Sequence, residues 1–312
     1  MKECMPDISL ARLTGLLGFT RQAYYQHFWH KQEIKIEHEL ILDQVRLIRK
    51  GNRALGTRKL HVMLQEFMME HQIKMGRDAL FDLLAEHHML VRRRKRKIPT
   101  TNSRHWLRRY PNLIQGLEVV RTNQVWVSDI TYLKTKQGYV YNSLNPDACS
   151  RKIMGYNLAD NLESVNTLKA LQMAIDFSLK HGKTVTGLIH HSDQGFQYCS
   201  NLYVKLLKTY GIRISMSDKG APLQNPIAER VNGILKHEYL FNGDLTNKQA
   251  AMKLLEEAVT SYNSFRPHLS CNMLTPDQAH QFDKVLKKCW KNYYPNPKEN
   301  VNVNVNVNLC QD

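Results

Sequence analysis

Three carboxylates, Asp129, Asp193 and Glu229, stand where an unpartnered acid is costly. Asp129 lies inside the apolar run VWVSDITYL, on the same alternation as Val127 and Leu133. Asp193 ends the apolar run GLIHHSD, and Glu229 lies in the helical pattern NPIAERVNGILKHEYL. Burying a carboxylate on an apolar face costs free energy unless the group is paired or binds a cation. Together the three acids supply the oxygen ligands that Mg²⁺ or Mn²⁺ prefers.

Such a site would suit phosphoryl transfer. Mg²⁺ and Mn²⁺ keep water ligands and accept phosphate oxygens as further ligands. Two bound ions can activate an attacking oxygen and stabilise the leaving oxygen of an in-line displacement. The chain contains 28 acids, so an accidental triple is common and spacing alone decides little. The sequences around the three acids therefore carry the prediction.

The elements that would position these acids belong to an α/β fold. The pattern predicts five short strands at 124–135, 138–150, 151–159, 187–193 and 212–217. It predicts helices at 163–182, 200–211, 225–240 and 247–262. Strands joined by hairpins and then separated by helices indicate a mixed sheet flanked by helices. The adjacent His190 and His191 are expected to pack at a strand end rather than to bind a metal.

The helix expected at 225–240 has one polar face. Asn225, Glu229, Asn232 and Lys236 recur at steps of four, three and four residues. This face is expected to meet the substrate, with three binding residues in addition to the acid: Asn225, Asn232 and Lys236.

The charge of the chain is concentrated towards its N-terminus. The formal net charge is +16 and the pI is about 9.6. Residues 1–110 hold 22 Lys and Arg against 11 Asp and Glu, or 22 − 11 = +11. The remaining residues hold 22 against 17, or +5. This asymmetry predicts a polyanionic partner, most commonly nucleic acid, for the first third of the chain. Solubility alone is the other interpretation.

The basic third reads as helical. Residues 8–28 predict two short helices around Gly18, which is the outline of a helix-turn-helix. Arg21 and Gln22 would lie on its second helix, and a longer helix is expected at 37–50. A second helical unit is expected over 51–67 and 73–97. The basic residues expected to contact nucleic acid in that unit and its basic run are Arg58, Arg77, Arg92, Arg93 and Arg94.

Composition excludes several other classes of protein. No run of 18 apolar residues is present, and the N-terminus lacks the apolar stretch of a signal peptide. The six cysteines are far apart, without a CxxC pair or a spacing that suits zinc. We therefore expect a reduced, cytoplasmic protein with no membrane partner.

The strings around the three acids resemble those of one family. VWVSDITYL, HHSDQGFQYCS and NPIAERVNGILKHEYL, with thirty-five residues between Asp193 and Glu229, resemble the Asp-Asp-Glu transposases of the insertion-sequence-three family. That family belongs to the retroviral integrase superfamily. YNSFRPHLSCNMLTP, at 262–276, resembles its Tyr-Asn…Arg-Pro-His…Thr-Pro signature. GTRKL, GRDALFDLL and TTNSRHWLRRYPNL are similar to its N-terminal helical region. The likeness covers roughly residues 8–280.

The resemblance implies a ribonuclease H-like core with a mixed five-stranded sheet and flanking helices, preceded by an all-α helix-turn-helix region. The implied segments are a helix-turn-helix-like module at 1–50, a second DNA-binding module with a basic linker at 51–110, an integrase-type catalytic core at 111–280, and a tail at 281–312 with low complexity at 300–308.

The resemblance also implies the reaction and its participants. Asp129, Asp193 and Glu229 would be catalytic ligands of Mg²⁺ or Mn²⁺, with two ions per site, and Lys236 would bind DNA. The enzyme would cleave DNA at insertion-sequence ends and join the 3′-hydroxyl to target DNA. Its partners would be double-stranded DNA, further copies of the chain on that DNA, and a helix-turn-helix protein from an upstream reading frame. Its location would be the bacterial cytoplasm, at the nucleoid.

Two other functions remain open at this point. A structure-specific ribonuclease H-like nuclease would share the acids but would not need a basic region of 110 residues. A DNA-binding regulator without enzymatic activity would gain nothing from three clustered carboxylates near phosphates. The chain departs from the family pattern at few positions: Gln224, where an acid is frequent, and Cys271 and Asn272, where Leu and Gly are commoner.

Overall fold

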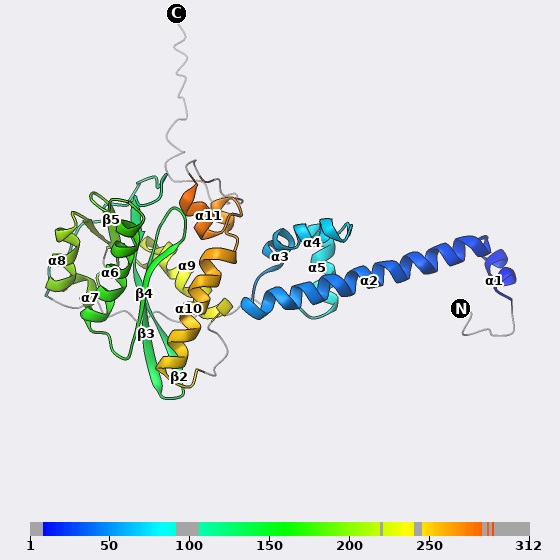
Figure 1. Ribbon diagram of the computed structural model, residues 1–312, viewed down its shortest axis with the longest axis horizontal. Coiled ribbons are helices and arrows are strands. Elements are labelled where there is room, and N and C mark those ends of the chain that lie inside the picture. The colour runs from blue at the N-terminus through cyan, green and yellow to red at the C-terminus, as the bar shows by residue number, and fades with distance from the viewer. Residues whose placement is uncertain are drawn as a thin grey trace, which may run out of the picture.

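The computed structural model describes residues 9–91, 106–218, 221–239 and 245–282, together with positions 286 and 289. Figure 1 shows a rounded α/β core beside a group of helices, from which α2 projects. Within the described ranges, no helix combines the length and apolarity needed to cross a membrane. Arg92, Arg93, Arg94 and the low-complexity stretch 300–308 lie outside these ranges.

The helices alternate with strands only in the second half of the chain. The α-helices are α1 (Leu10–Leu16), α2 (Arg21–Gly51), α3 (Thr57–Met63), α4 (Gln65–Glu70), α5 (Arg77–Glu86), α6 (Ser164–Lys180), α7 (Phe196–Cys199), α8 (Asn201–Thr209), α9 (Pro226–Ile234), α10 (Lys248–Phe265) and α11 (Pro276–Gln281). Shorter segments are the 3₁₀ turns η1 (Pro222–Gln224) and η3 (Leu269–Cys271) and the π-helical turn η2 (Leu235–Tyr239). The strands are β1 (Val125–Val127), β2 (Asp129–Thr135), β3 (Gly138–Pro146), β4 (Ile153–Ala159), β5 (Ile189–Ser192) and β6 (Arg213–Met216).

Two three-stranded sheets share the stretch of chain that holds β1 and β2. β1 pairs in parallel with β5, which pairs in parallel with β6. β2 pairs antiparallel with β3, which pairs antiparallel with β4. Every expected strand has a counterpart, but the first is divided at Ser128. The described residues therefore form six strands in two sheets, not five strands in one sheet.

The division at Ser128 has a simple physical cause. At this residue the chain changes from a parallel partner to an antiparallel one: the Ser128 amide donates to the His191 carbonyl at 2.8 Å, and the Ser128 hydroxyl donates to the Leu144 carbonyl at 3.0 Å. Ser128 is fully buried, and both its amide and its hydroxyl are used in these bonds. Asp129, the first residue of β2, is consequently placed at the junction of the two sheets.

Helices cover both faces of the core. α6 and α8 enclose one apolar cluster with residues of β1, β4 and β6, whereas α9 and α10 enclose another with β2, β3 and β4. In Figure 1 these two helical layers lie on opposite sides of the strands. α6 approaches β4 so closely at Gly155 that a Cβ there would overlap the Ala170 carbonyl. This layering confirms the predicted α/β core with flanking helices.

The N-terminal helices differ from the prediction. Thr20 caps α2 at its start, since its hydroxyl accepts from the Ala23 amide at 3.0 Å. However, α2 then continues without interruption to Gly51, so the second short helix and the expected helix at 37–50 are one element. The C-terminal half of α2 packs with α3, α4 and α5 around a separate apolar core. The expected boundary between residues 50 and 51 therefore falls within one packed unit, here called the helical module (residues 37–89).

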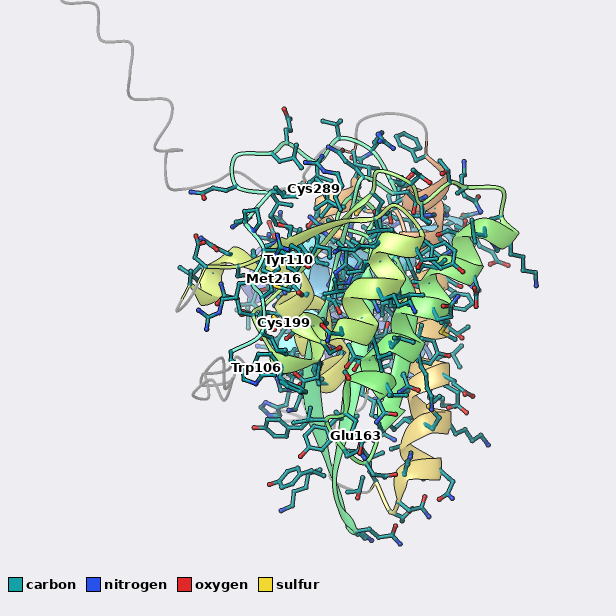
Figure 2. All side chains as sticks on the ribbon, turned by 90° about the vertical axis from the view of Figure 1, so that its left-hand side faces the viewer. Trp106, Tyr110, Glu163, Cys199, Met216 and Cys289 are labelled. Atoms are coloured by element: carbon teal, nitrogen blue, oxygen red, sulfur yellow. The ribbon has the colours of Figure 1, made fainter. Side chains whose placement is uncertain are left out.

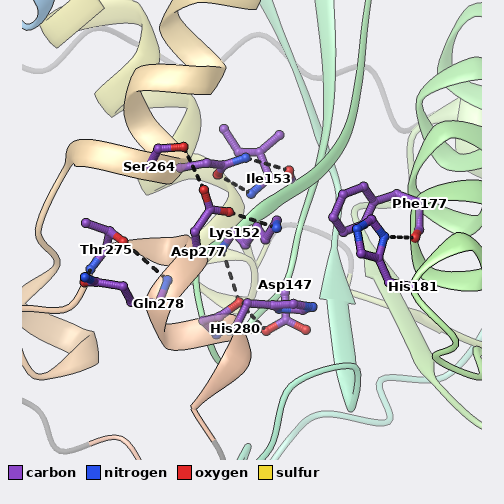
Figure 3. A network of polar contacts seen from close by, with 12 residues as sticks. Asp147, Lys152, Ile153, Phe177, His181, Ser264, Thr275, Asp277, Gln278 and His280 are labelled. Carbon is purple, nitrogen blue, oxygen red and sulfur yellow. Dashed lines mark hydrogen bonds and ion pairs between the residues drawn. The ribbon is translucent and has the colours of Figure 1, made fainter.

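The C-terminal signature holds α11 against the core. Asn263 in α10 accepts from the Ile153 amide at 3.0 Å and donates to the Ile153 carbonyl at 3.1 Å, as a neighbouring strand would. Asp277 in α11 pairs with Lys152 at 2.8 Å and accepts from Ser264 at 2.7 Å (Figure 3). Thr275 and Gln278 form a capping box at the start of α11. Most of this signature is therefore structural.

Candidate active site

The three predicted carboxylates come from three elements that meet at one edge of the core. Asp129 begins β2, and Asp193 directly follows β5. Because β1 and β5 are parallel neighbours, the ends of these strands lie side by side. Glu229 lies in the first turn of α9, which packs against β2 and β3. The fold therefore brings residues separated by 100 positions in the sequence to one place.

Asp129 is the most strongly perturbed of the three. Its carboxylate is half-buried and accepts from the Asn232 side-chain amide at 2.9 Å. Burial is the main cause that raises the pKa of Asp129 to about 7; the negative charges of Asp193 and Glu229 act in the same direction, and the Asn232 bond opposes them. The charges of both other acids therefore reach Asp129.

Asp193 is held by the turn that follows β5. Its carboxylate accepts from the Gly195 amide at 2.9 Å, which fixes the side chain over the turn. A Cβ on Gly195 would lie 2.9 Å from the same oxygen and 3.2 Å from the Gln197 side-chain oxygen. Gly195 has an ordinary negative φ of −63°. The glycine is therefore required for space beside Asp193 and not for backbone conformation.

We predict that Gly195→Ala moves the Asp193 carboxylate and lowers the DNA-cleavage rate by about tenfold, because small displacements of reacting groups are costly. Gly76→Ala is the matched control: Gly76 has a similar backbone conformation at a helix start, with nothing within 4 Å of its Cβ position. Cleavage rates and melting temperatures of both variants provide the test. Equal cleavage by both variants would remove Gly195 from the site.

Asn225 and Asn232 are placed differently from the prediction. Both are buried, at 6% and 4% exposed. Asn225 donates to the Ser128 carbonyl at 2.8 Å, and Asn232 donates to Asp129. Buried side chains whose amide groups already donate hydrogen bonds within the protein expose little surface to DNA. We therefore reassign them from DNA contact to holding the start of β2 against α9.

Lys236 lies on the π-helical turn η2 and not on a continuing α-helix. Its ammonium donates to the Tyr132 carbonyl at 2.8 Å and lies 4.1 Å from the centre of the Tyr132 ring. The expected straight helix over 225–240 is thus altered after Ile234, because the wider turn changes which way later side chains point. Lys236 consequently lies along β2, which starts with Asp129.

The adjacent histidines are structural, as predicted. His190 contacts the Tyr203 hydroxyl at 3.0 Å and the Asn145 side chain at 3.2 Å. His191 lies between two serine hydroxyls, Ser215 at 2.8 Å and Ser217 at 3.1 Å. Burial lowers the pKa of His190 to about 3 and that of His191 to about 4, so both are neutral at physiological pH.

The donor set suits a hard divalent cation. Carboxylate oxygens are the ligands such ions prefer, and a cation would offset the burial and the neighbouring charges that raise the pKa of Asp129. The buried Asn232 side-chain oxygen next to Asp129 has no hydrogen-bond partner among the described residues. In the described part of the chain, no three acids, histidines or cysteines are already close enough to hold an ion together. Glu229 is exposed on α9, whereas the two aspartates are half-buried.

Residues 106–113, at the boundary expected between the basic linker and the core, are described as one strip. This strip runs along the edge of the core: the Leu113 amide donates to the Ser215 hydroxyl at 2.8 Å, and Asn112 donates to Gln224, just before α9, at 3.0 Å. Trp106 is 89% exposed. Figure 2 shows Trp106 and Tyr110 on the same face as Cys199.

Arg109 in this strip lies near Cys199, at the end of α7. Burial is the main cause that raises the pKa of Cys199 to about 11; the charge of Asp193 acts in the same direction, and the charge of Arg109 opposes it. The same thiol therefore senses both Arg109 and Asp193. The alternation of basic and aromatic residues in RHWLRRY was the available signal.

The predicted DNA-binding residues of the N-terminal region fall into two groups. Arg58 and Arg77 begin α3 and α5, and both of their charges act on the carboxylate of Asp78. Arg77 already binds Asp78 through two hydrogen bonds, at 2.8 and 3.1 Å. Arg21 and Gln22 are exposed at the opposite end of α2, far from the core in Figure 1.

Comparison with known proteins agrees with this architecture. Two integrase core domain models match residues 120–222 and 210–276. The chain is 32% identical over 265 residues to the insertion element IS600 uncharacterized 31 kDa protein of Shigella sonnei, covering 84% of this chain and 94% of the relative. It is 32% identical over 182 residues to the transposase InsF for insertion sequence IS3A of Escherichia coli K12, covering 58% of this chain and 62% of the relative.

A solved structure of the HTLV-2 integrase catalytic core domain in complex with magnesium is also similar, at 20% identity and a TM-score of 0.41 over 51% of this chain and 97% of that chain. The sequence matches and the layered core define an integrase-type catalytic domain. The chain belongs to the insertion-sequence transposases of the retroviral integrase superfamily. Its function is DNA transposition, and the predicted resemblance is confirmed.

Proposed function

We propose that this transposase cleaves DNA at the ends of its insertion sequence and joins the freed 3′-hydroxyl to target DNA, at a site formed by Asp129, Asp193 and Glu229. One observation carries the proposal: half-buried Asp129 at the start of β2, Asp193 at the end of β5 and Glu229 in the first turn of α9 come together at one edge of the core, and the charges of the other two acids act on Asp129.

The three carboxylates would hold Mg²⁺ or Mn²⁺, two ions per site. Such ions supply activation of an attacking oxygen and stabilisation of the leaving oxygen. The chain itself contributes the positions of the acids. Asn232 orients Asp129, and the Gly195 amide orients Asp193. The exposed Glu229 would complete the site from α9 when DNA is bound.

DNA is the substrate, and we propose that its ends are recognised by the basic N-terminal region. Arg58 and Arg77 would contact phosphates together, whereas Arg21 and Gln22 would contact a separate stretch of the duplex. Because an insertion sequence has two ends, at least two copies of the chain would assemble on the DNA. An upstream-frame helix-turn-helix protein would add to this assembly.

One assay tests the proposed reaction. The substrate is a duplex that carries the terminal sequence flanking this coding region, labelled at the cleaved strand, with a target plasmid and Mg²⁺. We expect cleaved and joined products, and we expect Asp193→Asn and Glu229→Gln to yield neither while still binding DNA. Cleaved products alone would favour a structure-specific nuclease. Binding without either product would favour a regulator.

A prediction concerns Lys236. We expect Lys236→Ala to lower both cleavage and joining by about tenfold at sub-saturating DNA, because a positioning contact is lost. Lys236→Arg should recover part of the activity, since the charge is kept although its shape differs. Affinity for Mn²⁺ should not change in either variant. Lys134 is exposed on β2, the strand that carries Tyr132, and Lys134→Ala is the control. Full activity of Lys236→Ala would show that Lys236 serves only to pack on Tyr132.

A further inference from the structure

A buried ion pair joins the end of the catalytic helix, here α9 and its continuation η2, to the C-terminal signature at 262–276. Arg266, at the end of α10, donates to both carboxylate oxygens of Glu238, each at 2.7 Å. The side chains are 1% and 15% exposed. A third contact, between Arg266 and the ring of His268, measures 2.9 Å. A two-point pair of this kind fixes orientation as well as distance.

Glu238 lies on η2, the π-helical turn that also carries Lys236. This turn continues α9, which carries Glu229. Lys236 binds the Tyr132 carbonyl on β2, and Glu238 binds Arg266 on α10. The turn is therefore held from two sides: by β2, which begins with Asp129, and by Arg266 at the end of α10. Any movement of the Glu238 pair would be transmitted along η2 to Lys236.

The helical module reaches the same ion pair. Asn52, the buried residue that ends α2, donates to Glu238 at 3.4 Å. Lys59 in α3 is half-buried nearby. Burial is the main cause that lowers its pKa to about 7; the charge of Arg266 acts in the same direction, and the charge of Glu238 opposes it. Two side chains of the helical module thus face a pair that belongs to the catalytic core. We call Asn52, Lys59, Glu238 and Arg266 the junction cluster.

We propose that the junction cluster positions the catalytic helix for the transfer reaction, and that the helical module acts on the active site through it. Glu238 and Arg266 are positioning residues: neither touches the three acids, and each acts through η2. Buried ion pairs contribute little net stability compared with apolar packing, so a stabilising role alone does not explain this one. When the helical module binds DNA, a shift of Asn52 and Lys59 would change the position of η2.

The test uses the full chain, a labelled terminal duplex and Mg²⁺. It measures the single-turnover cleavage rate at saturating DNA, the Kd for DNA, and the melting temperature. The parent must cleave first; this outcome establishes the proposed function on which the inference rests, so the two can fail separately. The variants are Glu238→Gln, Asn52→Ala and Lys59→Met. Glu257→Gln is the control, because Glu257 is an exposed carboxylate on α10 outside the cluster.

We expect Glu238→Gln to lower the cleavage rate at saturating DNA by about tenfold, and Asn52→Ala and Lys59→Met by about threefold to tenfold. The Kd should change by less than about twofold, and Glu257→Gln should match the parent. A double variant, Lys59→Met with Lys236→Ala, should lose less than the product of the two single effects, because both act through η2.

Two results would overturn the inference. One is a normal rate at saturating DNA in both Asn52→Ala and Lys59→Met, which would show that the helical module does not act through the cluster. The other is independent, multiplicative effects of Lys59→Met and Lys236→Ala. If Glu238→Gln melts far below the parent, its cleavage rate is not used. The rates of Asn52→Ala and Lys59→Met then decide whether the inference holds.

Discussion

Asp129→Asn is expected to abolish cleavage and joining and at the same time to stabilise the metal-free protein. Cleavage should fall by about 10³-fold or more, the order found when one group of a preorganised catalytic site is removed. The Asn232 bond to position 129 can be kept, because an asparagine oxygen accepts as the carboxylate does. DNA binding should therefore survive, since the fold and the basic region are unchanged.

The gain in stability follows from the pKa of Asp129. Its value is raised from 3.8 to about 7 in the folded chain, so the folded chain binds this proton more tightly than the unfolded chain does. The stability of the metal-free parent accordingly falls as the pH rises from 3.8 to about 7. Asparagine removes this loss. In EDTA at pH 8, the variant should melt about 3 °C above the parent, and the gap should close towards pH 4.

Melting curves across this pH range, with and without Mg²⁺, provide the measurement. Mg²⁺ should raise the melting temperature of the parent more than that of Asp129→Asn, because the variant lacks a ligand. Asp160, an exposed carboxylate paired with Lys248 on the surface, gives the control Asp160→Asn. A variant at position 129 that joins DNA as the parent does would exclude Asp129 from the catalytic site.

Removal of residues 1–105 is expected to have the second largest effect, on DNA affinity and on recognition of the ends. The cut spares the strip 106–113, which packs on the core. The remaining chain carries 24 Lys and Arg against 17 Asp and Glu, or 24 − 17 = +7. If Arg21, Arg58 and Arg77 alone each contact one phosphate, the slope of log affinity against log salt should become shallower by about 2.7.

A slope difference of about 2.7 corresponds to about a 40-fold difference in how affinity falls between 50 and 200 mM salt. Titration of both proteins with terminal and unrelated duplexes over this range tests the prediction. The shortened chain should also bind the two duplexes equally. An unchanged preference for the terminal duplex would assign end recognition to the core.

The sequence was sufficient to predict the layers of the core and to single out the three acids that the fold brings to one edge. Strands such as 124–135 and 187–193 read as apolar runs because helices cover both faces of the sheets, and acids within such runs stand out. Thr20 was also readable as a helix cap, because its hydroxyl chemistry is local. These features depend on neighbours in the sequence or on burial alone.

Other features depend on partners that are distant in the sequence. The division at Ser128 arises from the carbonyls of His191 and Leu144, and the π-helical turn at Lys236 arises with Tyr132 and Arg266 as partners. Polar periodicity on α9 was correctly seen, but it could not distinguish a face that meets DNA from one that holds Asp129. The continuity of α2, by contrast, could have been predicted from the sequence, since no glycine or proline interrupts residues 21–50.

The unbroken α2 has a consequence for the spacing of contacts on DNA. At about 1.5 Å per residue, its 31 residues span about 46 Å. A duplex rises about 3.4 Å per base pair, so this length corresponds to about 14 base pairs, more than one helical turn. The helix therefore sets a constant interval between the contacts of Arg21, at its start, and those of Arg58 on α3, which follows its end. Terminal sequences suited to this transposase would carry two recognised blocks at that interval, with freely variable bases between them.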